Sequence, residues 1–231
     1  MSKPWHEALV EGDAAPYRIT LGGKPVKTPT KRALTAPGRA LAEAIVAEWR
    51  AQGDKIDPKS MPMTRYMNSI IDTVADHRAD IIEQVSAYGA SDLLCYRAEH
   101  PQELVARQAE AWDGPLTWVA KAKNAPMVVT TGIIAVEQPA ASLAALRTAV
   151  EAHDDAGLTA LHDLTSFSGS LVLALAVSAG HIDTETAWAA SRVDEVWQTE
   201  LWGDDDLATQ AAGNKHAAFI DAARLLDLSR G

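Results

Sequence analysis

The feature that most constrains this fold is a change of hydrophobic period near residue 37. Before that point apolar residues alternate, so that Tyr17, Ile19 and Leu21 share one face of an extended chain. Two glycines follow directly, and the apolar pattern then resumes, which is typical of a β-hairpin with a further strand at 32–35. Beyond residue 37 apolar residues recur at every fourth position, which predicts helix.

Most of the remaining chain has helical spacing. We expect helices at residues 37–52, 64–88 with a break, 101–123, 139–153, 157–179, 183–202 and 205–227. Residues 127–136 are an exception, because their β-branched side chains favour a strand or an extended segment. The predicted fold class is therefore α+β, with a small N-terminal antiparallel β unit at residues 1–36. A larger, mainly α-helical domain follows at residues 37–231.

Composition excludes several classes of partner. The 231 residues carry a formal net charge of −10 and an isoelectric point near 5.1, so we expect neither nucleic acid nor an anionic membrane as partner. The longest apolar run, residues 170–180, is about half of the ~20 residues that span a bilayer, so it predicts a buried helix. The single cysteine, Cys95, is expected to be an inert core thiol in a reducing compartment. With no secretory segment recognisable, we expect a soluble monomer of the bacterial cytoplasm.

The usual catalytic and metal-binding motifs fail one by one. The glycines at 22–23 lack the spacing of a phosphate-binding loop, and residues 166–170 lack the leading glycine of a nucleophile elbow. We expect the serines within residues 166–170 to ease helix packing. The seven histidines show no paired spacing, and the run Asp204–Asp206 lacks the alternate spacing of a calcium loop. That run is expected to start the last helix, so we predict no catalytic residue, no cofactor and no metal.

The segment 183–202 combines indoles and carboxylates. On one continuous helix, its core face would hold Ala189, Val193, Val196 and Trp197. A second stripe would hold Trp188, Glu195 and Trp202, which either packs beneath a neighbouring element or binds a partner.

Two further acids of this segment are candidates. Glu200 would fall within the apolar arc, so either the helix has ended there or the carboxylate is paired. Asp194 lies at the edge of the arc, where it can reach solvent or a cationic partner. The candidate partner-binding residues are therefore Asp194, Glu195, Trp188, Trp202 and Glu200.

Four segments in order carry a resemblance: "YRITLGGKPVKTP", "LAEAIVAEWRAQGDKIDPKSMPMTR", "SDLLCYRAEHPQELVARQAEAWDGPLTW" and "SRVDEVWQTELWG". Together they resemble the family of the bacterial and mitochondrial F1-ATPase assembly chaperone Atp12. The resemblance implies a protein without known catalysis that binds the free α subunit of F1 before that subunit joins β. It also implies a functional acid just before the Trp–Gly pair, for which Asp194 and Glu195 are both open.

Two other functions remain alternatives. One is a helical adaptor that keeps this fold but binds another client. The other is a hydrolase that uses the carboxylates of residues 194–206. The main prediction is a chaperone that is not an enzyme.

Overall fold

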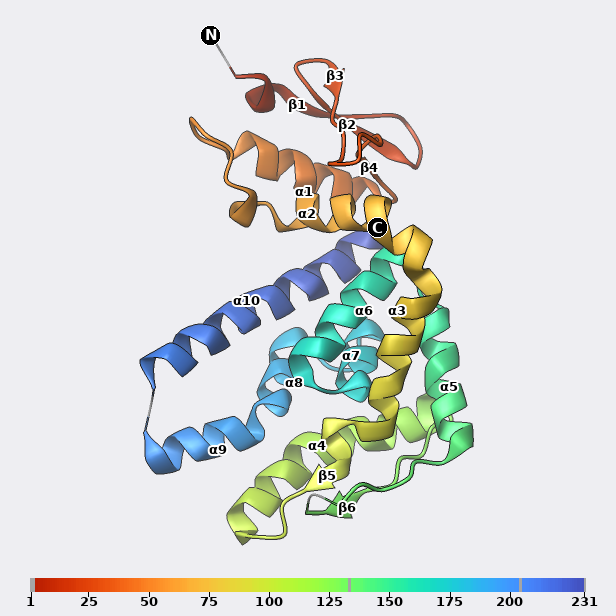
Figure 1. The fold of residues 1–231 in the computed structure, drawn as a ribbon, viewed down its shortest axis with the longest axis vertical. Coiled ribbons are helices and arrows are strands. Elements are labelled where there is room, and N and C mark those ends of the chain that lie inside the picture. The colour runs from red at the N-terminus through yellow and green to blue at the C-terminus, as the bar shows by residue number, and fades with distance from the viewer. Residues whose placement is uncertain (1–2, 133, 204, 231) are drawn as a thin grey trace. The chain divides into compact units, whose positions relative to one another are not determined.

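A computed structural model describes residues 3–132, 134–203 and 205–230 of the chain. It has a small antiparallel sheet at its N-terminus followed by a mainly helical region, which confirms the α+β class (Figure 1). The chain forms two compact units. One unit comprises Met1–Arg78, Asp154–Ala160 and Arg224–Gly231, and the other comprises Ala79–His153 and Leu161–Ala223. A division into domains at residue 37 stays a prediction.

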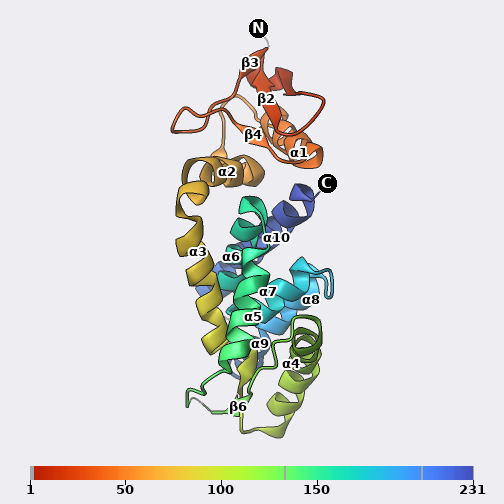
Figure 2. The same ribbon diagram turned by 90° about the vertical axis from the view of Figure 1, so that its right-hand side faces the viewer.

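The first unit contains a four-stranded sheet built around one central strand. Strand β2 (Tyr17–Leu21) pairs antiparallel with β1 (Ala8–Glu11) along one edge. Its other edge is shared by β3 (Lys24–Pro25) and β4 (Thr35–Ala36) (Figure 2). The predicted hairpin turn is confirmed, because Gly22 and Gly23 connect β2 to β3 with positive φ angles of 54° and 75°. Strand β1 has no counterpart among the predicted elements.

Helix α1 (Arg39–Arg50) packs on this sheet and is fixed to it at its end. Its apolar side chains at the predicted spacing, including Leu41 and Ile45, are fully buried. The guanidinium of Arg50 donates two hydrogen bonds, of 2.6 and 2.9 Å, to the carbonyl oxygen of Ala8. The first residue of β1 is thereby tied to the last turn of α1.

A buried carboxylate of α1 caps the next helix, α2 (Pro62–Ser69). Glu48 is 8% exposed and accepts hydrogen bonds from the amides of Met63 and Thr64, at 2.7 and 2.8 Å, and from the Thr64 hydroxyl at 2.7 Å. These are free N-terminal amides of a helix that has no capping side chain of its own. Burial raises the pKa of Glu48 despite these bonds.

The predicted break in the helix at 64–88 is confirmed. A π-helical turn, η3 (Ile70–Val74), separates α2 from α3 (Ala75–Ala87), and His77 within α3 has non-helical angles of φ −119° and ψ 18°.

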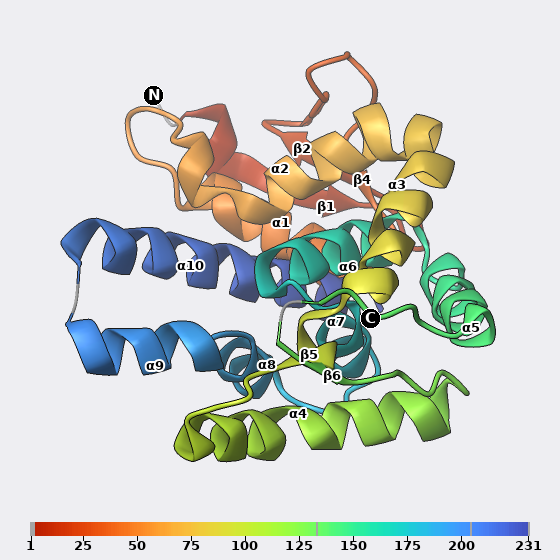
Figure 3. The same cartoon turned by 60° about the horizontal axis from the view of Figure 1, so that its bottom comes forward.

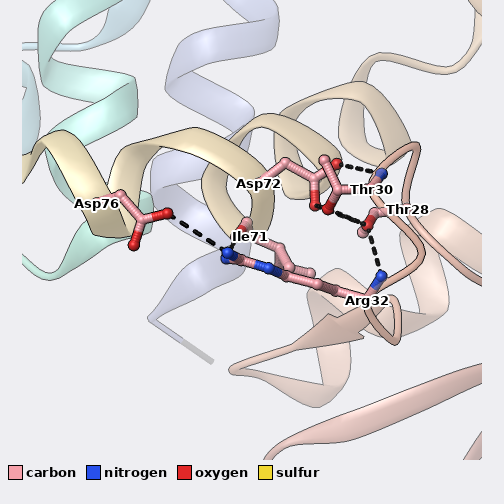
Figure 4. Close-up of polar contacts among 6 residues, drawn as sticks. All are labelled: Thr28, Thr30, Arg32, Ile71, Asp72 and Asp76. Carbon is pink, nitrogen blue, oxygen red and sulfur yellow. Dashed lines mark hydrogen bonds and ion pairs between the residues drawn. The ribbon is translucent and has the colours of Figure 1, made fainter.

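The π-helical turn is held by the loop that precedes β4 (Figure 4). Asp72 accepts hydrogen bonds from the hydroxyls of Thr28 and Thr30, at 2.6 and 2.5 Å. Arg32 of the same loop donates to the carbonyl of Ile71 at 2.6 Å. Although desolvation acts to raise it, the pKa of Asp72 is lowered by the bonds from Thr28 and Thr30. Two segments about forty residues apart in sequence are joined by these contacts.

The second unit is helical and surrounds a helix that is apolar on every side. Its helices include α4 (Gln102–Ala122), α5 (Ala140–Glu151), α7 (Leu171–Ser178), α8 (Thr184–Ser191) and α9 (Val193–Trp202), together with parts of α6 (Asp155–Ser168) and α10 (Asp206–Ser229). Residues 171–176 of α7 are at most 1% exposed, as predicted for a buried helix. Within the segment 127–136 that was predicted to be extended, β6 (Thr130–Thr131) pairs in parallel with β5 (Tyr96–Arg97).

The prediction of one continuous helix at 157–179 is wrong, because the structure has two helices there, α6 and α7. Gly169 adopts a positive φ of 70°, which ends α6, and the Ser170 hydroxyl then caps α7 by accepting from the amide of Leu173. Ser168 hydrogen-bonds within this break, at 2.6 Å to the carbonyl of Leu164. These serines therefore break and restart a helix, where we expected them to ease packing.

A second buried carboxylate fixes the start of α7. Asp92, which is 0% exposed, accepts from the Ser170 hydroxyl at 2.7 Å, the Val172 amide at 3.0 Å and the Leu94 amide at 3.1 Å. Burial raises the pKa of Asp92 to about 6. Nearby Cys95 is buried as predicted, and burial with the Asp92 charge raises the pKa of its thiol to about 12.

Replacing Glu48 should destabilise the first unit. Glu48→Ala leaves two buried amides without acceptors, so we expect the free energy of unfolding to fall by about 1 to 3 kcal/mol. The matched control is Glu43→Ala on the exposed side of the same helix, where only an exposed pair with Arg39 is lost and the change should stay within about 0.5 kcal/mol. Chemical denaturation measures both, and equal losses would contradict the capping role.

Asp92 should make stability depend on pH in a defined direction. Its folded pKa of about 6 lies above the ordinary value of 3.8, so the folded state binds the proton more tightly. The stabilisation of the folded state by this tighter proton binding is therefore fully present below about pH 4 and is lost as the pH rises through 6. Relative to Asp92→Asn, the wild type should lose up to about 3 kcal/mol between pH 4 and pH 7.5. If the unfolding free energies of the two proteins changed equally with pH, Asp92 would not be the source of this pH dependence.

Candidate protein-interaction site

The segment 183–202 forms two helices, where the sequence predicted one. Arg192, with φ −113° and ψ 8°, interrupts the rotation between α8 and α9. The predicted stripe of Trp188, Glu195 and Trp202 is therefore not a continuous row of one helix. The predicted core face is also wrong, because α9 has no buried residue and its Val196 is 49% exposed.

The indoles at the two ends of this segment have different environments. Trp188 on α8 is half-buried, and its ring lies 5.5 Å from that of Phe219 and 5.1 Å from that of His216, both on α10. Trp202 at the end of α9 is 79% exposed. Trp188 thus joins α8 to α10, whereas Trp202 is open to a partner.

Trp197 lies on the α4 side of α9. The prediction that it is a core residue is wrong. It is half-buried, and the guanidinium of Arg107 on α4 lies 4.8 Å from its ring centroid, within the range of a cation–π contact. The same guanidinium pairs with Glu200 at 2.8 Å, with both side chains nearly half exposed. Of the two alternatives for Glu200, the structure therefore has the paired one.

Asp194 also faces α4. Its carboxylate accepts from the amide nitrogen of Gln108, at 2.7 Å, while the Gln108 oxygen accepts from the amide of Ala98, at 2.7 Å. Because Gln108 is 2% exposed, both of its polar atoms need these partners. On α8, the carbonyl of Ala190 accepts from the indole of Trp112 at 2.7 Å. These contacts dock α8 and α9 onto α4.

Glu195 has a different position from its neighbour. It is exposed and pairs with Arg192 at 2.8 Å, one turn earlier, and it lines a groove on the side of α9 that faces α10. Asp194 and Glu195, which the sequence left as equivalent candidates, therefore differ in surroundings. Glu195 is the one available to a partner in this groove.

The groove runs between α8–α9 and the first half of α10, and its volume is about 800 Å³. We call it the α9–α10 groove, after two of the helices that line it, which are labelled in Figure 3. Its α9 wall carries Glu195, Val196 and Thr199, and its α10 wall carries small side chains, including Ala208 and Ala212. Trp188 contributes to the end of the groove near α8. The groove is therefore partly apolar, with carboxylates along its edge.

Exposed apolar side chains gather where α9 meets α10. Leu201 is 57%, Trp202 79% and Leu207 77% exposed. We call these three residues the hairpin tip. Gly203, with φ 86°, ends α9 between them. Large exposed apolar side chains so close in sequence are typical of a protein-binding surface.

The acids after the hairpin turn were expected to start the last helix. The carboxylate of Asp205 accepts from the amide of Leu207 at 2.8 Å, and Asp206 is the first residue of α10. Asp204 lies outside the described residues. Two of the three aspartates therefore have the predicted role at the helix start.

Sequence reasoning missed the α10 side of this site and the two α4 residues that hold α9. A signal for the α10 side was present, because Gly213 stands in the middle of a predicted helix and glycine is unfavourable there. No comparable signal marked Arg107 and Gln108, since their partners lie about ninety residues away in sequence.

Two features of the described residues bear on other functions. Across those residues, no helix is both long and apolar enough to cross a membrane. In the same part of the chain, no group of three or more His, Cys, Asp or Glu side chains is arranged to hold a metal ion.

Comparisons with known proteins give one consistent result. The family model for the ATP12 chaperone protein matches residues 2–120. The crystal structure of Atp12 from Paracoccus denitrificans is 43% identical, with 96% of each chain covered and a TM-score of 0.94. A lysine-for-aspartate mutant of the same protein is 42% identical, also with a TM-score of 0.94, over 96% of this chain and 95% of that one.

A third solved structure, from Agrobacterium tumefaciens, is 36% identical with a TM-score of 0.90. The match covers 96% of this chain and 83% of that one. The arrangement of helices described above is thus shared over nearly the whole chain.

Removing the amide of Gln108 should loosen α9 from α4. Gln108→Ala leaves the Ala98 amide and the Asp194 carboxylate without their partner, so we expect a loss of about 1 to 3 kcal/mol in unfolding free energy. Gln102→Ala, at the exposed start of the same helix, is the control and should be nearly neutral. Hydrogen exchange of the α9 amides should rise in Gln108→Ala alone, and unchanged exchange would contradict this role.

Proposed function

Because the chain belongs to the ATP12 chaperone family, we propose that it binds the free α subunit of F1-ATPase and protects it from aggregation during ATP synthase assembly. A chaperone acts on a protein partner, and the α subunit is the client that the family resemblance implies. We propose the bacterial cytoplasm as the location, in line with solved relatives from two bacteria.

The observation that carries this proposal is the exposed surface of α9 and the start of α10. The hairpin tip offers three large apolar side chains to solvent, and Val196 of α9 is 49% exposed as well. The sequence around them is acidic, with six acids and no Lys or Arg between residues 193 and 214. Such a surface binds apolar side chains of a client while its charge opposes self-association.

A physical cycle follows from this arrangement. A free subunit of a ring enzyme exposes apolar interfaces that are covered only in the assembled ring, and such surfaces promote aggregation. An acidic chaperone covers one of them and keeps the complex soluble by charge repulsion. Release requires only that the β subunit bind the same client surface more tightly, so the exchange needs no nucleotide.

Within this proposal the five candidate residues divide by role. Glu195 and Trp202 contact the client directly, because both are exposed. Asp194, Glu200 and Trp188 act through position, since each holds α8 or α9 against a neighbouring helix. Substitution of the first pair should therefore weaken client binding without loss of stability.

The decisive experiment is a pull-down with free α and free β subunits in parallel. We expect the wild type to capture α in preference to β and to suppress aggregation of isolated α. Glu195→Lys should weaken capture about tenfold by placing a cation in an acidic surface. Asp194→Lys should lower thermal stability as well, because it removes the acceptor of Gln108.

Two outcomes would overturn the proposal. One is a wild-type protein that does not suppress aggregation of the α subunit at any stoichiometry. The other is selective capture of a different protein from native extract with no enrichment of α, which would favour an adaptor with another client. Capture that is equal for wild type and both variants would remove α9 from the interface.

A further inference from the structure

We infer that the α9–α10 groove takes one amphipathic helix of the client, with an apolar face flanked by Lys or Arg. This inference rests on the proposed function for the source of the helix. The chemistry of the helix itself comes from the shape, lining and charge of the groove.

The shape of the groove suits a helix. Its walls are themselves two helices, α9 and the first half of α10, which lie beside one another in two views (Figures 1 and 3). The lining residues on this side extend from Asp205, just before α10, to His216 on α10, a length of roughly 17 Å at 1.5 Å per residue. A partner helix of about three turns fills that length. Its apolar side chains would meet Val196, Ala208 and Ala212, as in other helix-in-groove complexes.

One residue of the groove is unfavourable for the helix that carries it. Gly213 lies in the interior of α10, and a Cβ atom added there would meet nothing within 4 Å. No packing contact among the described residues therefore requires glycine at this position, although glycine weakens a helix interior. Its backbone lines the groove, where the missing side chain lets another helix approach closely.

Charge selects the flanks of the incoming helix. Glu195, Glu200 and Asp205 line the groove, against one arginine, Arg192, and His216. Arg192 pairs with Glu195 and Arg107 pairs with Glu200, so Asp205 carries the remaining negative charge at the edge of the groove. Basic flanks complement this edge, whereas acidic ones are repelled.

The same charge argues against two other occupants. A second copy of this chain would bring the same acidic edge against itself, and a membrane surface rich in anionic lipid would be repelled in the same way. An extended peptide would need free strand edges, which the helical walls do not offer.

The test uses the full-length protein and two variants of one residue. Gly213→Ala adds one methyl group and should raise thermal stability by improving the helix. Gly213→Leu should preserve the helix but fill the groove. The probe is a labelled amphipathic peptide of about 18 leucines and lysines, long enough to be helical when bound, with a leucine–glutamate peptide as control.

We expect Gly213→Ala to bind the lysine peptide about threefold more weakly than the wild type, because its methyl group lies where the incoming helix approaches. Gly213→Leu should bind it about tenfold more weakly, and none of the three should bind the glutamate peptide. Free α subunit should show the same order among the variants. A photoreactive group at Thr209 should cross-link to a helical segment of α that carries Lys or Arg beside its apolar face.

The outcomes separate this inference from the proposed function. Undiminished capture of α by Gly213→Leu, or cross-links that map to a strand or loop, would overturn the groove as a helix site and leave the client proposal intact. If α is not captured but the lysine peptide binds and is blocked by Gly213→Leu, the client proposal fails and the helix site stands. Equal binding of the lysine peptide by all three proteins would overturn the helix site.

Discussion

The Asp92 carboxylate is the interaction on which the helical unit depends. It has no exposed surface, and it accepts hydrogen bonds from two segments almost eighty residues apart in sequence. A charge in that position is stabilised only when each donor is in place, so it requires one arrangement of α7 against the segment before α4. Because α7 is apolar on all sides, this carboxylate supplies the direction that hydrophobic burial alone cannot specify.

The helices of the candidate site, α8 and α9, are held to the rest of the unit by contacts that weaken with distance from this centre. Trp112 holds α8 through a buried hydrogen bond, Gln108 holds the first turn of α9, and Arg107 holds its last turns through a half-exposed ion pair. Exposed ion pairs contribute little, so the far end of α9 is the least firmly held. The same end carries the hairpin tip. The hairpin tip is thus attached through the part of α9 that the weakest of these contacts holds.

How much the sequence could predict follows the range of the interactions. The hairpin, the α+β class and the buried α7 were predictable because period, turn glycines and apolar composition are local signals. The helix breaks at Gly169 and Arg192 were not predictable. The first depends on the Ser170 cap and on its bond to the distant Asp92 carboxylate, and the second lies where α8 and α9 dock onto α4. The different surroundings of Glu195 and Asp194 were likewise not predictable, because no spacing along α9 reveals their neighbours.

The first unit is assembled from the beginning, a short middle portion and the end of the chain. Its final portion includes Leu225 and Leu226, both at most 1% exposed, and Arg224, whose charge acts on the buried Glu48. During synthesis the sheet and α1 are therefore complete long before the residues that finish their unit exist. The chaperone itself must therefore pass through a state in which part of its own core is exposed to solvent. The client that it is proposed to protect is likewise a protein with an exposed apolar surface.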